Sequence, residues 1–225
     1  MDATPQSAIF EELLDGRYSC RGFLPEPVPR NTIEHILRIS QRTPSWCNTQ
    51  PWQVTITSGA STERFREAML AASDREPSPD FAWPAKYQGV YQERRRECGY
   101  GLYESVGVAR GDRAASAQQA LENFRLFGAP HVAIITTDAS LGVYGAIDCG
   151  GWVGNFMLAA RSLGVATIAQ AALSSWPDIV REQLGLPADR LMVCGISFGF
   201  EDTSHRANKF RTARAPLESV VQWRD

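Results

Sequence analysis

The sequence has few cysteines and histidines, and neither residue type is arranged as a set of ligands. Its five cysteines are widely spaced, their number is odd, and none forms a Cys-x-x-Cys pair. This usage argues against a disulfide framework or a zinc site and favours a reducing compartment. The three histidines, His35, His131 and His205, are too scattered to indicate a metal site. We therefore expect a protein without a bound metal.

Long apolar runs and a strong net charge are also missing. No uninterrupted hydrophobic segment is long enough to span a bilayer, and the acidic stretch MDATPQSAIFEELLDGRYS lacks the apolar core of a signal peptide. The formal net charge is −2, which gives no reason to expect nucleic acid or an anionic membrane as a partner. We expect a cytoplasmic protein that binds neither.

The sequence does contain enough apolar material for a substantial core. Of its 225 residues, 44% are hydrophobic and 10% aromatic, as is typical of globular proteins. The periodicities predict a mixed α+β pattern without an internal repeat, in which Asn31 caps the second helix. Helices are predicted over residues 6–15, 31–42, 61–73, 93–106, 115–127, 144–163 and 177–186. Strands are predicted over residues 52–58, 131–137, 165–170 and 191–200.

Two segments depart from ordinary periodicity. Residues 74–92, DREPSPDFAWPAKYQGVYQ, are rich in proline and aromatic side chains, a composition that suits either a functional lid or a surface insertion. The predicted helix over 144–163 is apolar nearly all round and contains repeated glycines, which lower helix stability. Their use suggests that another backbone approaches closely, within a large core or across a subunit interface.

The motif GISFG at residues 195–199 matches the nucleophile elbow of serine hydrolases but lacks its context. Ser197 lies inside a predicted strand rather than on a strand-to-helix turn, and His205 is the only later histidine. We interpret Ser197 as a strand residue, whereas a hydrolase would lose esterase activity on Ser197→Ala. The sequence also has no glycine-rich dinucleotide fingerprint and no P-loop.

Two arginine-bearing segments are candidates for an anion site. RYSCRGF places Arg17, Ser19 and Arg21 at alternating positions, which point the same way in an extended chain. Guanidinium groups favour bidentate recognition of phosphate, although a solvated loop would have the same pattern. Much later in the chain, NKFRTARAPL carries Arg211 and Arg214. The sequence does not show whether the two segments meet.

These two segments and three others resemble, in order, the motifs of the FMN-dependent nitroreductase family. RYSCRGF is similar to R-x-S-x-R-x-F, and PSWCNTQPW is similar to P-S-x-x-N-x-Q-P-W. FGAPHVAIIT resembles the segment before a core strand, AIDCGGWVGNFMLAARSLGVATIAQAAL the central helix and flavin-cupping loop, and RTARAPLESVV the C-terminal arm. The resemblance covers nearly the whole chain and is strongest to the nitrobenzoate-reductase-like branch.

The resemblance implies a single nitroreductase-like domain over residues 1–225, with a central mixed, mostly antiparallel sheet flanked by helices. It also implies an intertwined homodimer that binds FMN at its interface and takes electrons from NADH or NADPH. Hydride would pass through flavin N5, in a ping-pong reaction, to a nitroaromatic or a quinone. Two alternatives stay open, namely reductive dehalogenation of an aromatic and FMN binding without catalysis.

The resemblance also assigns cofactor contacts. The two arginine segments would bind the FMN phosphate, while the PSWCNTQ loop and the backbone near residue 170 would line the ring. The implied cofactor-binding residues are Arg17, Tyr18, Ser19, Arg21, Pro44, Ser45, Trp46, Cys47, Asn48, Gln50, Asn123, Arg125, Ala169, Gln170, Ala171, Arg211 and Arg214. Because the cofactor carries the chemistry and solvent can supply protons, we assign no catalytic side chain.

Departures from the family pattern leave two points open. Ala169 stands where many relatives have proline, and Trp46 and Cys47 replace small polar residues. Trp46 would narrow the pocket, stack on an aromatic substrate or pack against the partner subunit. Cys47 has no histidine placed to activate it, so we interpret it as inert. The expected substrate contacts are Trp46, Phe81, Trp83, Tyr87 and Tyr91.

Overall fold

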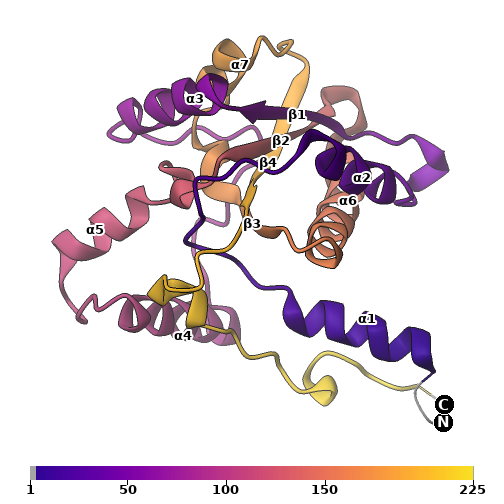
Figure 1. Cartoon of the computed structure of the whole chain (residues 1–225). Helices are drawn as coiled ribbons and strands as arrows, with labels where there is room; N and C mark the ends of the chain where they lie inside the picture. The colour runs from indigo at the N-terminus through magenta and orange to yellow at the C-terminus, as the bar shows by residue number, and fades with distance from the viewer. Residues whose placement is uncertain (1–3, 225) are drawn as a thin grey trace.

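The computed structural model describes residues 4–224 and has a four-stranded sheet at its centre (Figure 1). The strands are β1 (Gln53–Ser58), β2 (His131–Asp138), β3 (Ala166–Gln170) and β4 (Arg190–Gly199). Their order is β1-β2-β4-β3, and all three strand pairs are antiparallel. The predicted mixed character is limited to one parallel bridge between Ser19 and Thr167, at the β3 edge. The predicted α+β class is confirmed.

Within residues 4–224, seven α-helices surround the sheet, each near a predicted position. They are α1 (Pro5–Gly16), α2 (Arg30–Ser40), α3 (Ala60–Ala71), α4 (Gly89–Ser105), α5 (Arg113–Leu121), α6 (Gly142–Ser162) and α7 (Pro177–Leu184). The predicted cap at Asn31 is wrong, because α2 starts one residue earlier and its capping residue is Pro29. The 74–92 excursion is shorter than predicted, since α4 already begins at Gly89.

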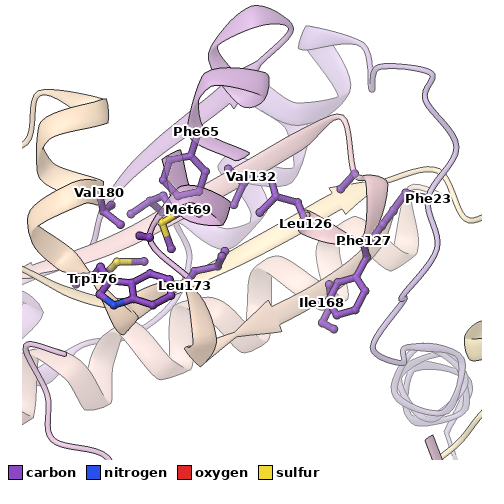
Figure 2. Close-up of a cluster of buried hydrophobic side chains, with 14 of the residues drawn as sticks. Phe23, Phe65, Met69, Leu126, Phe127, Val132, Ile168, Leu173, Trp176 and Val180 are labelled. Carbon is purple, nitrogen blue, oxygen red and sulfur yellow. The ribbon is translucent and has the colours of Figure 1, made fainter. Parts of the chain in front are cut away.

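The core lies on both faces of the sheet, and β2 shows why. Val132 and Ile134 belong to a cluster with α3 and α7, whereas Ala133 and Ile135 belong to a cluster with α2 and α6. Successive side chains of a strand point to opposite faces, so a continuous apolar run is expected where both faces are covered. Figure 2 shows the first cluster, in which Val132 of the sheet lies near side chains of α3 and α7.

Helix α6 uses its glycines in two different ways. A Cβ on Gly145 would lie 2.4 Å from Thr137 Oγ1, so this glycine lets the helix approach β2 closely. Gly150 and Gly154 have no such neighbour within 4 Å among the described residues. They share the helix with the exposed side chains of Val143 and Ile147. Packing in the core therefore explains why residue 145 is a glycine, but it does not explain the glycines at Gly150 and Gly154.

The two ends of the chain extend along the lower side of the molecule in Figure 1. Helix α1 lies there, and residues 200–224, which we call the C-terminal arm, run from the end of β4 past α4 towards α1. Among the described residues 4–224, no helix is both long and apolar enough to cross a membrane.

Candidate functional site

The two arginine segments meet at one cavity of about 690 Å³. The extended chain after α1 forms one wall, and the C-terminal arm and α4 form the others. The lining residues are Leu14, Asp15, Arg17, Tyr18, Ser19, Arg21, Cys98, Phe210, Arg211, Thr212 and Arg214. The structure thus brings together six of the predicted cofactor residues, from segments almost two hundred positions apart.

The cavity concentrates positive charge. Among residues 4–224, the observed ion pairs include none of Arg17, Arg21, Arg211 or Arg214. Burial and the nearby charge of Arg214 lower the pKa of Arg17, and burial lowers the pKa of Arg21. A bound anion would relieve both the repulsion and the desolvation of these guanidinium groups. Asp15 is the one acidic residue in the lining.

Contacts within the cavity wall hold the arm's arginines in place. The guanidinium carbon of Arg211 lies 3.5 Å from the ring centroid of Tyr18, a close cation–π stack. Arg214 donates from Nη1 to Thr212 Oγ1 at 2.8 Å. The backbone N–H of Arg21 donates to Oδ1 of Asn208 at 2.7 Å. Sequence reasoning missed Asn208, because an asparagine beside basic residues looks like an ordinary solvated position.

A second cavity, of about 490 Å³, adjoins the first between α4 and the C-terminal arm. It shares Cys98, Phe210, Arg211 and Arg214 with the first cavity and adds Arg94. Sequence reasoning assigned no role to Cys98 or Phe210, which lie in both linings.

The PSWCNTQ loop lies elsewhere in the chain, and none of its residues lines the arginine cavity. It sits between α2 and the first turns of α6, where the ring of Trp46 packs on Tyr144 with centroids 4.7 Å apart. The N–H of Trp46 donates to Asp148 at 3.1 Å, and the N–H of Gln50 donates to Ser45 Oγ at 2.9 Å. The predicted loop contacts are therefore separate from the phosphate-binding candidates within one chain.

The backbone of this loop is strained. Cys47, Asn48 and Gln50 all have positive φ angles, of 51°, 55° and 48°, a region that non-glycine residues rarely adopt. The loop nevertheless exposes its side chains, with Trp46 63% exposed. Strained, exposed segments held by specific hydrogen bonds occur often at ligand-binding sites.

The predicted residues near the end of β3 form a third group. Gln170 is buried, and its Nε2 donates to the carbonyl oxygen of Asn123 at 2.9 Å. Its Oε1 accepts a hydrogen bond from the hydroxyl of Ser197, in the buried middle of β4. Ala169 and Ala171 are exposed on either side of Gln170. The prediction that Ser197 is a strand residue is confirmed, and its burial excludes the nucleophile elbow.

Arg125, predicted with this third group, forms an ion pair with Glu122 at 2.8 Å. This ion pair involves Nη1 of the guanidinium, so the other nitrogens of the half-buried side chain can still contact a ligand.

The first half of the 74–92 excursion is firmly attached to the sheet and to α7. Asp80 pairs with Arg181 at 2.5 Å and accepts the N–H of Met192 at 2.7 Å. Ser78 donates its N–H to the carbonyl oxygen of Ser175 at 2.8 Å. These hydrogen bonds and the ion pair hold residues up to Asp80 in place. If the excursion acts as a lid, only the residues after Asp80 are therefore free to move.

The aromatic side chains of the excursion follow this attached part. Phe81 is half-buried, whereas Trp83, Tyr87 and Tyr91 are exposed. None of the four lines either of the two arginine cavities. Their predicted contact with substrate stays a prediction.

The fold is of the α+β class, and its arginine-lined cavity has side chains suited to a phosphate group. Comparison with known proteins makes the assignment specific. Residues 14–200 match the model of the nitroreductase family, so the chain belongs to that family. The family resemblance predicted from the motifs is confirmed.

The similar proteins include several named nitroreductases. The chain is 36% identical to nitroreductase NfnB of Mycolicibacterium smegmatis, covering 95% of this chain and 92% of that protein. It is 32% identical to a 4-nitrobenzoate reductase of Nocardioides, covering 97% of this chain and 91% of that protein. The solved structure of the FMN-dependent NfnB from Mycobacterium smegmatis in complex with NADPH superposes with a TM-score of 0.93 at 35% identity, covering 98% of this chain and all of that one.

Proposed function

We propose that this chain is an FMN-dependent nitroreductase that oxidises NADH or NADPH and reduces a nitroaromatic or a quinone. The observation that carries the proposal is the meeting of Arg17, Ser19 and Arg21 with Arg211 and Arg214 around one cavity, in a member of the nitroreductase family. When bound, FMN would carry electrons from the nicotinamide donor to the acceptor. The donor and the acceptor would bind in turn to the same face of the flavin.

The arginine cavity would hold the phosphate of FMN. Its guanidinium groups present several N–H donors that form no ion pair within the described part of the chain, and the Ser19 hydroxyl adds another donor. Arginine binds phosphate oxygens in a bidentate manner, so two or more of these side chains can share one dianion. The role of this chain's residues is to bind and orient the cofactor rather than to react.

A homodimer would bring the loop and the cavity together. Within one chain, the PSWCNTQ loop does not line the arginine cavity, although the family resemblance assigns both to one flavin. The exposed face of α6, with Val143, Ile147, Gly150 and Gly154, suits a second copy of this helix, because glycines allow close approach and the apolar side chains gain burial. The loop, at the start of α6, would then reach the flavin of the partner chain.

The exposed backbone near Gln170 completes the proposed ring contacts. The side chain of Gln170 is directed inward, where it bonds to Asn123 and Ser197. Ala169 and Ala171 are exposed on either side of Gln170, so a backbone group of this stretch could hydrogen-bond to the polar edge of the ring.

A visible spectrum of the purified protein tests the main proposal. We expect a flavin spectrum that bleaches on addition of NADH or NADPH without oxygen and returns on addition of a nitroaromatic. A flavin spectrum that no nicotinamide bleaches would indicate FMN binding without catalysis. A colourless protein that cannot be reconstituted with FMN would refute the proposal.

The acceptor class needs a separate assay. Turnover of nitrobenzoate, a quinone and a halophenol at matched concentrations would distinguish nitroreduction or quinone reduction from reductive dehalogenation. Alanine substitution of Trp83 and Tyr87 is expected to change the preference among acceptors while FMN stays bound. Unchanged preference would show that the exposed part of the 74–92 segment is not a substrate lid.

A further inference from the structure

One buried asparagine joins the C-terminal arm to the segment after α1. Asn208 is only 3% exposed. Its Oδ1 accepts the N–H of Arg21 at 2.7 Å, and its Nδ2 donates to the carbonyl oxygens of Gly22 at 2.8 Å and Asp202 at 2.9 Å. The amide therefore uses its oxygen and both of its hydrogens, so its orientation is fully specified.

The backbone of the same residue holds an arginine of the arm. Nη1 of Arg211 donates to the carbonyl oxygen of Asn208 at 2.6 Å. Asn208 thus contacts the backbone of Arg21 through its side chain and the guanidinium of Arg211 through its backbone. These two arginines come from opposite walls of the same cavity.

Close packing around Asn208 leaves little freedom for the arm. A Cβ on Gly22 would lie 2.3 Å from Cγ of His205, so the arm rests directly on the Gly22 backbone. The N–H of Asp202 also donates to the carbonyl oxygen of Gly22, at 3.0 Å. The C-terminal arm therefore packs directly against the segment that carries Arg17, Ser19 and Arg21.

We propose that Asn208 is a positioning residue for the phosphate site. It sets the separation of the arginines on the two walls, so that they present their donors to one phosphate monoester. Without its side chain, the charge repulsion between Arg17 and Arg214 would favour separation of the walls. This inference rests on the proposed function, because the ligand it names is the phosphate of FMN.

The matched ligands FMN and riboflavin test this role, because riboflavin lacks the phosphate. We expect Asn208→Ser, whose hydroxyl can keep one of the three hydrogen bonds, to weaken FMN binding by roughly tenfold, the loss typical of one charge-assisted contact. Riboflavin binding, measured by equilibrium dialysis of the apoprotein, is expected to stay within about twofold, the margin left for small indirect effects. The difference between FMN and riboflavin should shrink at high salt, which screens the arginine–phosphate attraction.

Thr62→Val provides the control for a general loss of stability. The buried hydroxyl of Thr62 bonds to Thr57 and to the carbonyl oxygen of Pro130, away from both arginine cavities. We expect this variant to melt at a lower temperature but to bind FMN as the wild type does. An equal loss of FMN and riboflavin binding in Asn208→Ser, or no loss of either, would overturn the positioning role.

Limited proteolysis gives a second readout that does not require the flavin. Trypsin cleaves after lysine and arginine, and Lys209, Arg211 and Arg214 follow Asn208 in the arm. We expect faster cleavage at these sites in Asn208→Ser than in wild type or Thr62→Val. Unchanged cleavage would mean that Asn208 does not hold the arm. Wild-type protein that does not bind FMN would instead refute the proposed function, together with the inference that rests on it.

Discussion

Gly99 and Gly101 of α4 provide a matched test of how the C-terminal arm is held. Both lie within the helix, and neither has a positive φ angle. A Cβ on Gly99 would meet no atom within 4 Å, whereas a Cβ on Gly101 would lie 2.5 Å from Cε2 of Phe210. Alanine at the two positions therefore has the same effect on the backbone and differs in one contact with the arm.

The expected magnitudes follow from helix propensity and packing. Replacing glycine by alanine inside a helix gains about 1 kcal/mol, so Gly99→Ala should raise the free energy of unfolding by about that amount. For a chain of this size, the melting temperature should rise by about 2–4 °C. At Gly101 the same gain is opposed by an overpacking cost of about 1–3 kcal/mol, because the Phe210 ring must move. Gly101→Ala should therefore be less stable than Gly99→Ala by about 1–3 kcal/mol.

Thermal unfolding and FMN titration of both variants measure these effects. Phe210 precedes Arg211 and lines both cavities, so its displacement should weaken FMN binding in Gly101→Ala and not in Gly99→Ala. Equal stabilisation of the two variants, with equal FMN affinity, would show that the packing of Phe210 on α4 does not hold the arm.

Three further predictions concern other parts of the chain. Tyr18→Phe should keep FMN affinity, because it keeps the ring that stacks on Arg211. Tyr18→Leu should lose affinity several-fold, because it removes this stack of about 1 kcal/mol, and equal affinities of the two variants in a titration would contradict this. Burial lowers the pKa of His131 below 6.5, and both ring nitrogens are hydrogen-bonded. The neutral ring of His131 therefore contributes fully to the free energy of unfolding above about pH 6.5. This contribution is lost as the pH falls through the folded-state pKa. Urea unfolding from pH 7.5 to 5 should show a shallower pH dependence in His131→Gln but not in the exposed control His35→Gln. At Gly154 an added Cβ would meet no atom of residues 4–224 within 4 Å. Gly154→Leu should convert a dimer to a monomer in light scattering, and an unchanged mass would exclude this face of α6 as the interface.

The positions of helices and strands could be predicted from the sequence because their signals are local. The continuous apolar run over residues 131–137 predicted a strand, and the structure has β2 there. The two clusters around Val132 and Ala133 explain why the run is continuous. The strand assignment of Ser197 followed from the same reasoning. The errors were at boundaries: α2 begins one residue before the predicted start, and α4 begins at Gly89 rather than at residue 93.

The arrangement of the candidate site depended on contacts that local patterns do not encode. The sequence by itself determined which residues are basic, which segments are helix or strand, and to which family the motifs point. Only the tertiary structure decided that Arg21 and Asn208, 187 positions apart, share a hydrogen bond, and that the PSWCNTQ loop lies away from the cavity within one chain. The physical reason is that periodicity reports how one segment exposes its faces, whereas the meeting of two segments depends on how all the faces pack together.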